Sequence, residues 1–371
     1  MRAALWLCAA ALPAACGAIR AYGHAFSAPG DFTPAQYAYI AAAFPLFTVE
    51  KRHAYAVYGN ASAPAASPAR YNSIAASVGT ARRIKALRAS ARVLMYWNAA
   101  LHWNFYECEA DVQPAWLLPP SHGLGVPAYN YAEPGFRAWW VACAVGALRG
   151  SAGALDGLFV DALPKLSWPG QPANAYALWG AMLDAVRAAV PAAFVIINAD
   201  FNSPSGAVIA NATSLLAHAD AVYAESMSSI DTPAAAAAPA NSVAYLRFLE
   251  TSTAAAAAAG KLFAGHGLLD PAAPARSFTF GLALFLLATP DPAAGLFLAN
   301  DGYQVDQGLL APHAEYALAF GLPRGPFTAA GAVLTRAFEN ATVVADLAAR
   351  TATIAMGPPG ATPAELGPAK V

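Results

Sequence analysis

The sequence predicts an α/β protein built on a (β/α)8 TIM-type barrel with a small C-terminal antiparallel β appendage. Short apolar runs alternate with helical stretches, eight such runs occur, and most are continuous runs without strict alternation. Continuous apolar strands are typical of parallel sheets that helices cover on both faces. Regular alternation of strand and helix also indicates a parallel sheet. Eight repeats favour a closed ring over a doubly wound open sheet, and no G-x-G-x-x-G follows the first strand.

The N-terminus has the three-part pattern of a secretory signal peptide. Arg2 supplies a positive charge, residues 3–15 are apolar, and small residues near Gly17 and Ala18 suit a cleavage site. The alternative is a membrane anchor, but the apolar run is shorter than the roughly 20 residues that span a bilayer. We therefore expect a signal peptide over residues 1–18, no stable membrane insertion, and a location that is secreted or in the lumen of the secretory pathway.

The strands and helices of the barrel are expected within residues 19–323. Thr33 before Pro34 is an N-cap followed by proline at the first helical position. Pro134 opens another helix, and Gly150 can end it. The predicted strands are residues 20–25, 44–49, 92–98, 156–161, 194–199, 221–225, 261–266 and 295–300. Besides the helix that begins at Pro34, the predicted helices are 135–149, 173–189, 241–259 and 276–288.

The chain between and beyond these elements has other patterns. Residues 277–288 are apolar on all sides but short for a membrane span, which predicts a buried helix. The low-complexity segments 61–69 and 233–240 are interpreted as loops. Residues 324–356 predict a small β segment, with strands at 333–338, 342–346 and 351–356, and residues 357–371 predict a disordered tail.

Composition excludes several classes of partner and suggests export. The net charge is −1 with no basic stripe, so we expect no binding to nucleic acid. Cys108 and Cys143 remain after the signal segment, and in an oxidising compartment they are expected to form a disulfide. Sequons at Asn60, Asn211 and Asn340 are consistent with a secreted glycoprotein.

Polar side chains end six consecutive predicted strands. In a (β/α)8 barrel the active site lies where the strands end, so these residues are expected to meet at one rim. Apolar strands have no folding reason to end in this way so often. The residues concerned are Tyr96, Trp97 and Asn98 on the third strand, Asp161 on the fourth, Asn198 and Asp200 on the fifth, Glu225 on the sixth, His266 on the seventh and Asp301 on the eighth.

Asp161 and Glu225 are the best candidates for catalysis. Cleavage of a glycosidic bond needs one protonated carboxyl group to donate to the leaving oxygen and one ionised group to attack or to activate water. Asp200 is a rival for the acid, and Asp301 before Gly302 can instead form a turn. Structural roles such as an N-cap or an ion pair remain the alternative for the pair, and Glu250 is expected to be structural or solvated.

Aromatic and imidazole side chains near the same rim suit sugar binding. Sugar C–H faces stack on aromatic rings, while hydroxyls need donors and acceptors. Trp97, His102 and Trp103 follow the third strand, and His266 is a candidate hydroxyl contact. Burial in the core is the alternative for these large rings. Other chemistries lack their motifs: there is no G-x-S-x-G, no H-E-x-x-H, no P-loop and no clear zinc spacing, so no metal or cofactor is expected.

Several segments resemble hypothetical glycosyl hydrolase family 15, a group of barrel glycoside hydrolases. The resemblance implies glycoside hydrolase activity on an oligosaccharide or polysaccharide. In the wider α-galactosidase-like barrels a nucleophilic aspartate follows strand four and an acid/base follows strand six, where Asp161 and Glu225 stand. A glutamate at the second place departs from the usual aspartate. The segments are 157–161, 198–200, 223–226, 300–303, 316–323 and 334–340.

The sequence therefore predicts a secreted retaining glycoside hydrolase in which Asp161 attacks and Glu225 donates and then accepts the proton. One alternative is a carbohydrate-binding barrel without catalysis, which needs no paired carboxyl groups. Another is an exported structural protein with a solvated polar rim.

Overall fold

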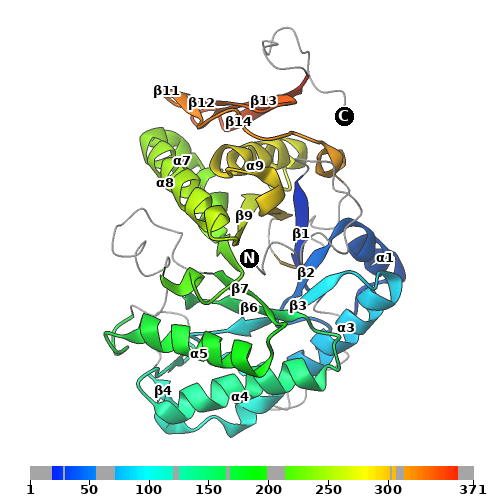
Figure 1. The fold of residues 1–371 in the computed structure, drawn as a ribbon, viewed down its shortest axis with the longest axis vertical. Coiled ribbons are helices and arrows are strands. Elements are labelled where there is room, and N and C mark those ends of the chain that lie inside the picture. Colours follow the sequence, from blue (N-terminus) through cyan, green and yellow to red (C-terminus); the bar gives the residue numbers. More distant parts are fainter. Residues whose placement is uncertain are drawn as a thin grey trace.

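A computed structural model gives the fold of the chain (Figure 1). It describes residues 19–27, 30–55, 72–119, 125–163, 168–198, 214–300, 303–305 and 313–357. The predicted signal peptide, the loop expected at 61–69 and the tail beyond residue 357 lie outside the described residues. These expectations, and the exact borders of the domains, stay predictions.

Eight parallel strands form a closed barrel, as the sequence predicts (Figure 1). Each strand pairs with the next around the ring, and the last pairs with the first. This closure shows that the open-sheet alternative is wrong. In ring order the strands are β1 (Arg20–Ala25), β2 (Leu46–Val49), β3 (Arg92–Asn98), β6 (Gly157–Asp161), β7 (Phe194–Asn198), β8 (Ala221–Ala224), β9 (Leu262–Leu268) and β10 (Gly295–Asn300).

The predicted strand borders agree with the structure for β1, β3 and β10 and differ slightly elsewhere. β2 begins two residues later than predicted because Phe44 still caps the preceding helix, where its N–H donates to the carbonyl of Ile40 (3.0 Å). β9 continues two residues beyond His266, to Leu268, which pairs with β10. The length of a neighbouring strand decides where pairing stops, and local sequence carries no record of it.

Helices surround the barrel (Figure 1). Thr33 caps α1 as predicted. Its side chain accepts the backbone N–H of Gln36 (3.2 Å), and the Gln36 side chain accepts the backbone N–H of Thr33 (2.8 Å). The helices are α1 (Pro34–Ala43), α3 (Ser73–Leu87), α4 (Pro134–Gly150), α5 (Ala175–Ala189), α7 (Pro233–Ala237), α8 (Pro239–Ala258) and α9 (Pro274–Ala288).

Two helical segments differ from the prediction. The loop predicted at 233–240 is wrong, because this stretch forms α7 and the start of α8. Thr232 caps α7 by accepting the N–H of Ala235 (3.2 Å), and alanine is the best helix former, so low complexity here produces a helix. α3 has no counterpart among the predicted helices. The side chains on its buried face are mostly small, so the two faces differ little in hydrophobicity. The buried residues are Ser73, Ala76, Ser77, Thr80, Ala81 and Ile84.

A four-stranded antiparallel sheet covers the outer side of α9 (Figure 1). Since the barrel packs on one side of α9 and the sheet on the other, nearly every residue from Ser277 to Ala288 is buried. The predicted β appendage and the predicted buried helix are therefore confirmed together. In order across the sheet, the strands are β11 (Thr328–Ala330), β12 (Val333–Ala337), β13 (Ala341–Asp346) and β14 (Thr351–Met356).

Arg336 joins this sheet to the C-terminus of α9. Its guanidinium donates to the carbonyls of Leu286 (3.0 Å), Leu287 (2.7 Å) and Thr289 (2.9 Å). These are carbonyls that a helix end leaves without intrahelical partners, so a buried cation here satisfies them. Glu250 of α8 pairs with the same guanidinium at 3.4 Å, which gives Glu250 a structural place away from the barrel rim.

The connection between β3 and α4 is braced covalently. Cys108 and Cys143 form a disulfide whose Cα atoms lie 6.2 Å apart, within the usual range, so the predicted pairing is confirmed. The same connection contains a small hairpin of β4 (Leu117–Leu118) and β5 (Ala128–Tyr129). The bridge ties this polar connection to a helix of the barrel wall.

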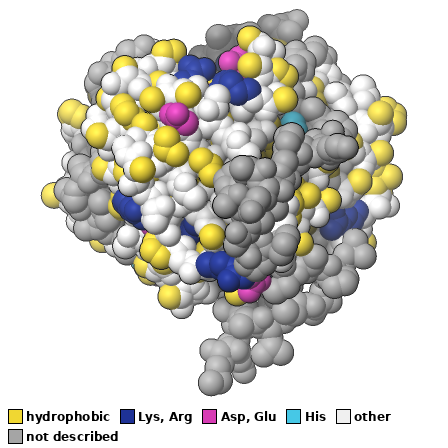
Figure 2. Space-filling view, turned by 90° about the horizontal axis from the view of Figure 1, so that it is seen from above, with side chains coloured by type: hydrophobic (Ala, Val, Ile, Leu, Met, Phe, Trp, Pro, Cys, Tyr) yellow, Lys and Arg dark blue, Asp and Glu magenta, His cyan; other side chains and the backbone are white. Residues whose placement is uncertain are grey.

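Figure 2 shows the face of the molecule on the side of the C-terminal sheet, where a few charged side chains of both signs lie among hydrophobic and uncharged ones. Among the described residues, no helix combines the length and the apolar character that a membrane crossing requires.

Candidate active site

The ends of β6, β7 and β8 bring the two predicted catalytic carboxylates together. Asp161 is the last residue of β6, Asn198 ends β7, and Glu225 directly follows β8. The Asn198 amide nitrogen donates to Asp161 Oδ1 at 2.8 Å and to Glu225 Oε2 at 2.9 Å. The sum of these distances is 5.7 Å, so the two carboxylate oxygens cannot lie further apart than that.

The orientation of the Asn198 amide follows from its neighbours. Two carboxylates can only accept from it when ionised, so the nitrogen must face them. The amide oxygen is buried and has no hydrogen-bond partner. An unsatisfied buried acceptor costs about 1–3 kcal/mol. The fold thus tolerates one orphaned oxygen in order to place two N–H groups between the carboxylates.

A chain of directed hydrogen bonds holds Asp161 from the β3 side. Asn98 Oδ1 accepts the backbone N–H groups of Ala100 (2.9 Å) and Leu101 (2.6 Å), which fixes its amide orientation. Asn98 Nδ2 therefore donates to the Tyr96 hydroxyl (2.8 Å), and that hydroxyl donates to Asp161 Oδ2. Both donors to Asp161 are obligatory in this arrangement.

Glu225 is held by a hydroxyl that can reverse its role. Tyr303 donates to Glu225 Oε1 (3.0 Å), and its hydroxyl lies 3.1 Å from that of Tyr223. Either tyrosine can be the donor in the latter contact. Burial raises the pKa of both tyrosines well above the usual value, and the carboxylate of Glu225 adds to the effect. Both therefore stay neutral and can donate or accept.

The backbone beside Asp161 is strained. Ala162 has φ +68°, in the left-handed region that a β-carbon disfavours by roughly 1–2 kcal/mol. Such strain often marks functional sites where the surroundings impose a conformation. Here the positive φ of Ala162 turns the chain sharply just after Asp161, at the end of β6.

His266 lies near the two tyrosines beside Glu225, whereas Trp97 lies away from the carboxylates. The His266 ring is 5.9 Å from the rings of both Tyr223 and Tyr303. Trp97 alternates with its neighbours on β3, points out of the barrel and packs against Trp140 of α4 at 5.9 Å. Trp97 is only 1% exposed, so its place is in the packing between strand and helix, away from the carboxylates.

His102 and Trp103 lie in the β3–α4 connection. Trp103 stacks on Phe105, and Lys51 Nζ lies 5.8 Å from the Trp103 ring and 4.1 Å from that of Tyr96. Trp103 is thus one side chain removed from the residue that holds Asp161. His102 instead approaches Glu109 at 4.0 Å. Asp200 and Asp301 lie outside the described residues, so their predicted roles stay predictions.

Glu109 is a buried carboxyl at the base of this connection. It accepts the Tyr129 hydroxyl (2.7 Å) and the backbone N–H of Tyr106 (2.8 Å). Burial raises the pKa of Glu109 to about 7, although these bonds oppose the shift. Burial also lowers the pKa of His102. Near pH 7 His102 is therefore mostly neutral, and a substantial fraction of the Glu109 carboxyl groups holds a proton.

The sequence analysis did not single out the polar groups on β1 and β2. His24 of β1 donates through Nε2 to the carboxylate of Glu50 (2.7 Å), which also pairs with Lys51. Burial alone would raise the pKa of Glu50, but Lys51 and His24 outweigh it and lower this pKa to about 2. The signal was present, because Glu50 directly follows an apolar strand like Asp161 does. Tyr303, which holds Glu225, was noticed only within a family segment.

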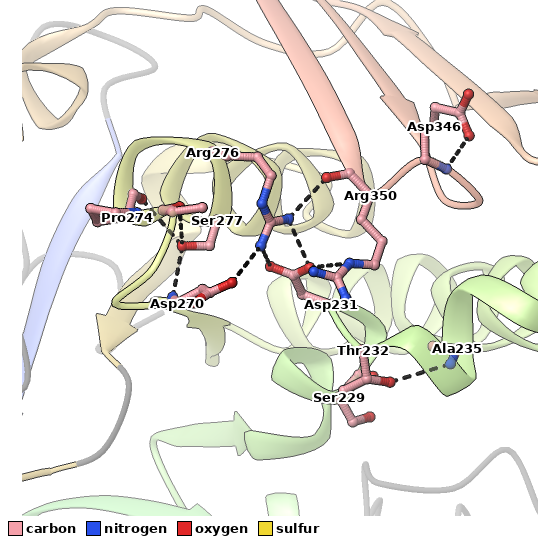
Figure 3. A network of polar contacts seen from close by, with 12 residues as sticks. Ser229, Asp231, Thr232, Ala235, Asp270, Pro274, Arg276, Ser277, Asp346 and Arg350 are labelled. Atoms are coloured by element: carbon pink, nitrogen blue, oxygen red, sulfur yellow. Dashed lines mark hydrogen bonds and ion pairs between the residues drawn. The ribbon is translucent and has the colours of Figure 1, made fainter.

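A buried ion cluster secures the short helix that begins with Glu225 (Figure 3). Asp231 ends this segment and accepts two bonds from Arg276 of α9 (2.9 and 3.1 Å). Arg350, from the turn before β14, reaches the same carboxylate at 3.1 Å, and its carbonyl accepts from Arg276 (2.9 Å). The C-terminal sheet therefore supports the chain segment that carries Glu225.

No group of three or more His, Cys, Asp or Glu side chains that could hold a metal ion occurs in the part of the chain that the structure describes.

Solved structures resemble this chain, and the two with TM-scores of 0.50 and 0.52 share its architecture. The α-amylase of Anoxybacillus is 10% identical and matches 92% of this chain and 94% of its own, with a TM-score of 0.50. Amy13B of Eubacterium rectale is 10% identical, with coverages of 88% and 85% and a TM-score of 0.52. The glycoside hydrolase domain of PelA from Pseudomonas aeruginosa is 15% identical, with coverages of 77% and 98% and a TM-score of 0.49.

The sequence itself matches one family over most of its length. No curated protein matches the chain in sequence. The profile of hypothetical glycosyl hydrolase family 15 matches residues 85–342, which include both carboxylates and Asn198 between them. The chain therefore belongs to hypothetical glycosyl hydrolase family 15, as a glycoside hydrolase built on a closed eight-stranded barrel.

Proposed function

We propose that this protein is a secreted retaining glycoside hydrolase that cleaves an oligosaccharide or polysaccharide. Asp161 is the nucleophile and Glu225 the general acid and base. The observation that carries the proposal is the shared amide of Asn198, which holds Asp161 Oδ1 and Glu225 Oε2 within 5.7 Å of each other, and this close spacing supports a retaining mechanism. Retaining enzymes hold their carboxyl groups about 5–5.5 Å apart, whereas inverting enzymes leave about 6.5–9.5 Å for a water molecule.

The directions of the hydrogen bonds support the assignment of Asp161 as nucleophile. A nucleophile must be ionised, and hydrogen bonds donated to a carboxylate favour its charged form. Asn198 can only donate to Asp161, and Asn98 forces the Tyr96 hydroxyl to donate as well. No proton on Asp161 would find an acceptor among these partners.

The same reasoning supports Glu225 as the acid and base. The group in this role must hold a proton in one step and lose it in the next. Tyr303 can donate to Glu225 when it is ionised, and can accept from it by turning its own proton toward Tyr223. A reversible partner of this kind suits a carboxyl group that changes its protonation state.

The proposed reaction has two steps. First, Asp161 attacks the anomeric carbon while Glu225 gives its proton to the leaving oxygen, so the glycosidic bond breaks and a glycosyl ester forms. Second, Glu225 takes a proton from water as the water oxygen attacks the anomeric carbon and releases Asp161. No cofactor enters this scheme. Tyr96 and Asn98 lie on the Asp161 side of the pair, and His266 packs against the two tyrosines on the Glu225 side. These three residues, together with Trp103, Asp200 and Asp301, are the proposed sugar contacts.

Export is part of the proposal. The disulfide between Cys108 and Cys143 supports folding in an oxidising compartment. Asn340 of the third sequon is exposed in the turn between β12 and β13, where a glycan could be attached.

The test measures hydrolysis and its stereochemistry. New reducing ends are counted on a panel of soluble polysaccharides, and the first-formed anomer is read by proton NMR. Asp161→Asn and Glu225→Gln should abolish release, while the matched control Asp346→Asn, at the end of β13 in the C-terminal sheet, should retain it. Glycan binding without hydrolysis by the unaltered protein would instead identify a carbohydrate-binding barrel. An inverted first product would overturn the retaining mechanism.

A further inference from the structure

We propose that a groove on the outside of the barrel is a second carbohydrate-binding site, which holds an uncharged stretch of glycan away from the catalytic pair. The groove lies between the start of α5 and the residues just before β8, and its volume is about 600 Å³. Pockets that bind small ligands usually measure about 300–1,000 Å³. The side chains that matter are Trp168, Gln171, Asn174, Tyr176, Ser214 and His218.

The chemistry of the lining points to a neutral sugar chain. Trp168 and Tyr176 offer partly exposed aromatic surface for the C–H faces of sugar rings. Amide, hydroxyl and imidazole groups alternate with them, and these can donate to or accept from sugar hydroxyls. Among the lining residues that the structure describes, none is an Asp, Glu, Lys or Arg, and this favours an uncharged ligand.

The floor of the groove is fixed before any ligand arrives. The Gln171 side chain donates to the carbonyl of Tyr129 (2.7 Å) and accepts the N–H of Tyr131 (3.2 Å). Its backbone N–H donates to the carbonyl of Trp168 (3.2 Å), which closes the turn that presents the indole. A platform that is already ordered loses little conformational entropy on binding.

Two polar side chains of the groove, Asn174 and His218, differ in how the fold uses them. Asn174 holds the N-cap position of α5, yet its side chain makes no capping bond. An asparagine at an N-cap normally accepts a backbone N–H of the first turn, so its amide is free for another partner. His218 bonds to Asp184 through Nδ1 (2.8 Å), and its other nitrogen lies against Gly180, where a β-carbon would be only 2.7 Å away. The missing side chain at Gly180 lets the imidazole lie at the groove.

The position of the groove suits a long substrate. Trp168 follows Asp161 by seven residues in the β6–α5 connection, so the two Cα atoms are at most about 25 Å apart, from the reach of an extended chain. Gln171 joins this connection to the β3–α4 connection, which also lies at the catalytic end of the barrel. A polysaccharide cleaved at Asp161 can therefore extend into the groove. This inference depends on the proposed function in one respect only, namely that the ligand is a glycan.

The test is affinity electrophoresis in native gels that each contain one neutral polysaccharide: galactomannan, xyloglucan, arabinoxylan or glycogen. Asp161→Asn serves as the background, so that hydrolysis does not degrade the gel. We expect retardation in at least one gel, and Trp168→Ala should weaken this binding about tenfold or more because the aromatic surface is lost.

A second pair of variants guards against misfolding. Ala177 lines the groove and Ala185 is exposed on the same helix outside it. Ala177→Glu should abolish retardation by placing bulk and charge in the groove, whereas Ala185→Glu should leave it unchanged. Equal retardation of these two variants, or no retardation in any gel, would overturn the proposal. Groove-dependent retardation in a protein that hydrolyses nothing would keep this proposal and refute the catalytic one.

Discussion

Two acidic sites lie near the same end of the barrel and are stabilised in different ways. After β2, Glu50 is 3% exposed and contacts a lysine and a histidine, Lys51 and His24. These neighbours lower the pKa of Glu50 to about 2 against the effect of burial. Its charge is therefore compensated by a cation at all ordinary pH values.

After β6 and β8, the partners of Asp161 and Glu225 are neutral. Amide and hydroxyl groups donate to both carboxylates, and no ion pair to either one occurs within the described ranges. Charge-assisted bonds of this kind fix the geometry of a carboxylate and leave its charge uncompensated. The comparison indicates that Asp161 and Glu225 can react with a developing positive charge at an anomeric carbon, and that Glu50 has a supporting role.

The largest expected effect is at Asp161, whose hydrogen-bond partners are neutral. Asp161→Asn keeps the size and most hydrogen-bonding capacity of the side chain but removes the nucleophile, so kcat should fall on the order of 10⁴-fold or more. Initial rates on the best polysaccharide of the panel measure it. If Glu50→Gln lost as much activity as Asp161→Asn while folding normally, the distinction between the two sites would fail.

Removal of the cation should damage the other site through stability. Lys51→Met leaves the buried Glu50 carboxylate with only His24, and breaking a buried ion pair in this way costs roughly 3–5 kcal/mol of unfolding free energy. Urea denaturation at pH 7 measures the loss. The double variant Glu50→Gln/Lys51→Met should recover most of it, because no buried charge remains. A double variant as unstable as Lys51→Met would attribute the loss to packing.

Glu109 sharpens the comparison, since it is a buried carboxyl with neutral donors and no cation in contact. Its pKa is about 7 in the folded protein and 4.5 in an ordinary setting, so the folded state holds the proton more tightly. Stability contributed by this group is present below pH 4.5 and is lost as the pH rises toward 7, by roughly 3 kcal/mol from the linkage relation.

The matched variant for that effect is Glu109→Gln, which keeps an acceptor for Tyr129. Its unfolding free energy should lack this decline between pH 5 and pH 8, so the two proteins should diverge as the pH rises. Parallel stability curves for variant and unaltered protein would show that Glu109 does not titrate in this range.

The smallest expected effect on stability concerns the shared amide. Asn198→Ala removes the donor common to Asp161 and Glu225, and loss of one positioned donor typically lowers kcat by about 10²–10³-fold. The unfolding free energy should change by less than about 1 kcal/mol, because the orphaned amide oxygen is removed as well. A raised KM with unchanged kcat would assign Asn198 to ground-state binding of the sugar.

Sequence reasoning predicted the barrel well because its signals are local. A buried parallel strand is a continuous apolar run, and the residue after it lies at the catalytic rim. This rule located Asp161, Asn198 and Glu225 without any knowledge of their contacts. Glu50 follows the same rule at the end of β2, but the prediction covered only the third to eighth strands.

The rest depended on contacts between distant residues. Trp97 and Tyr96 are adjacent in sequence, but strand alternation sends one into helix packing and the other to the carboxylate. The double contact of Asn198 and the reversible role of Tyr303 arise from side chains on different strands. Such geometry requires the closed ring, and no single segment encodes it.

The most direct test of the central claim is to trap and locate the covalent intermediate. The protein is incubated with a 2-fluoro glycoside matched to the best substrate, digested with pepsin, and the labelled peptide is sequenced by mass spectrometry. Our account predicts one glycosyl group per chain, attached to Asp161. A label on Glu225 or Asp200, or hydrolysis that proceeds with inversion and no label, would contradict it.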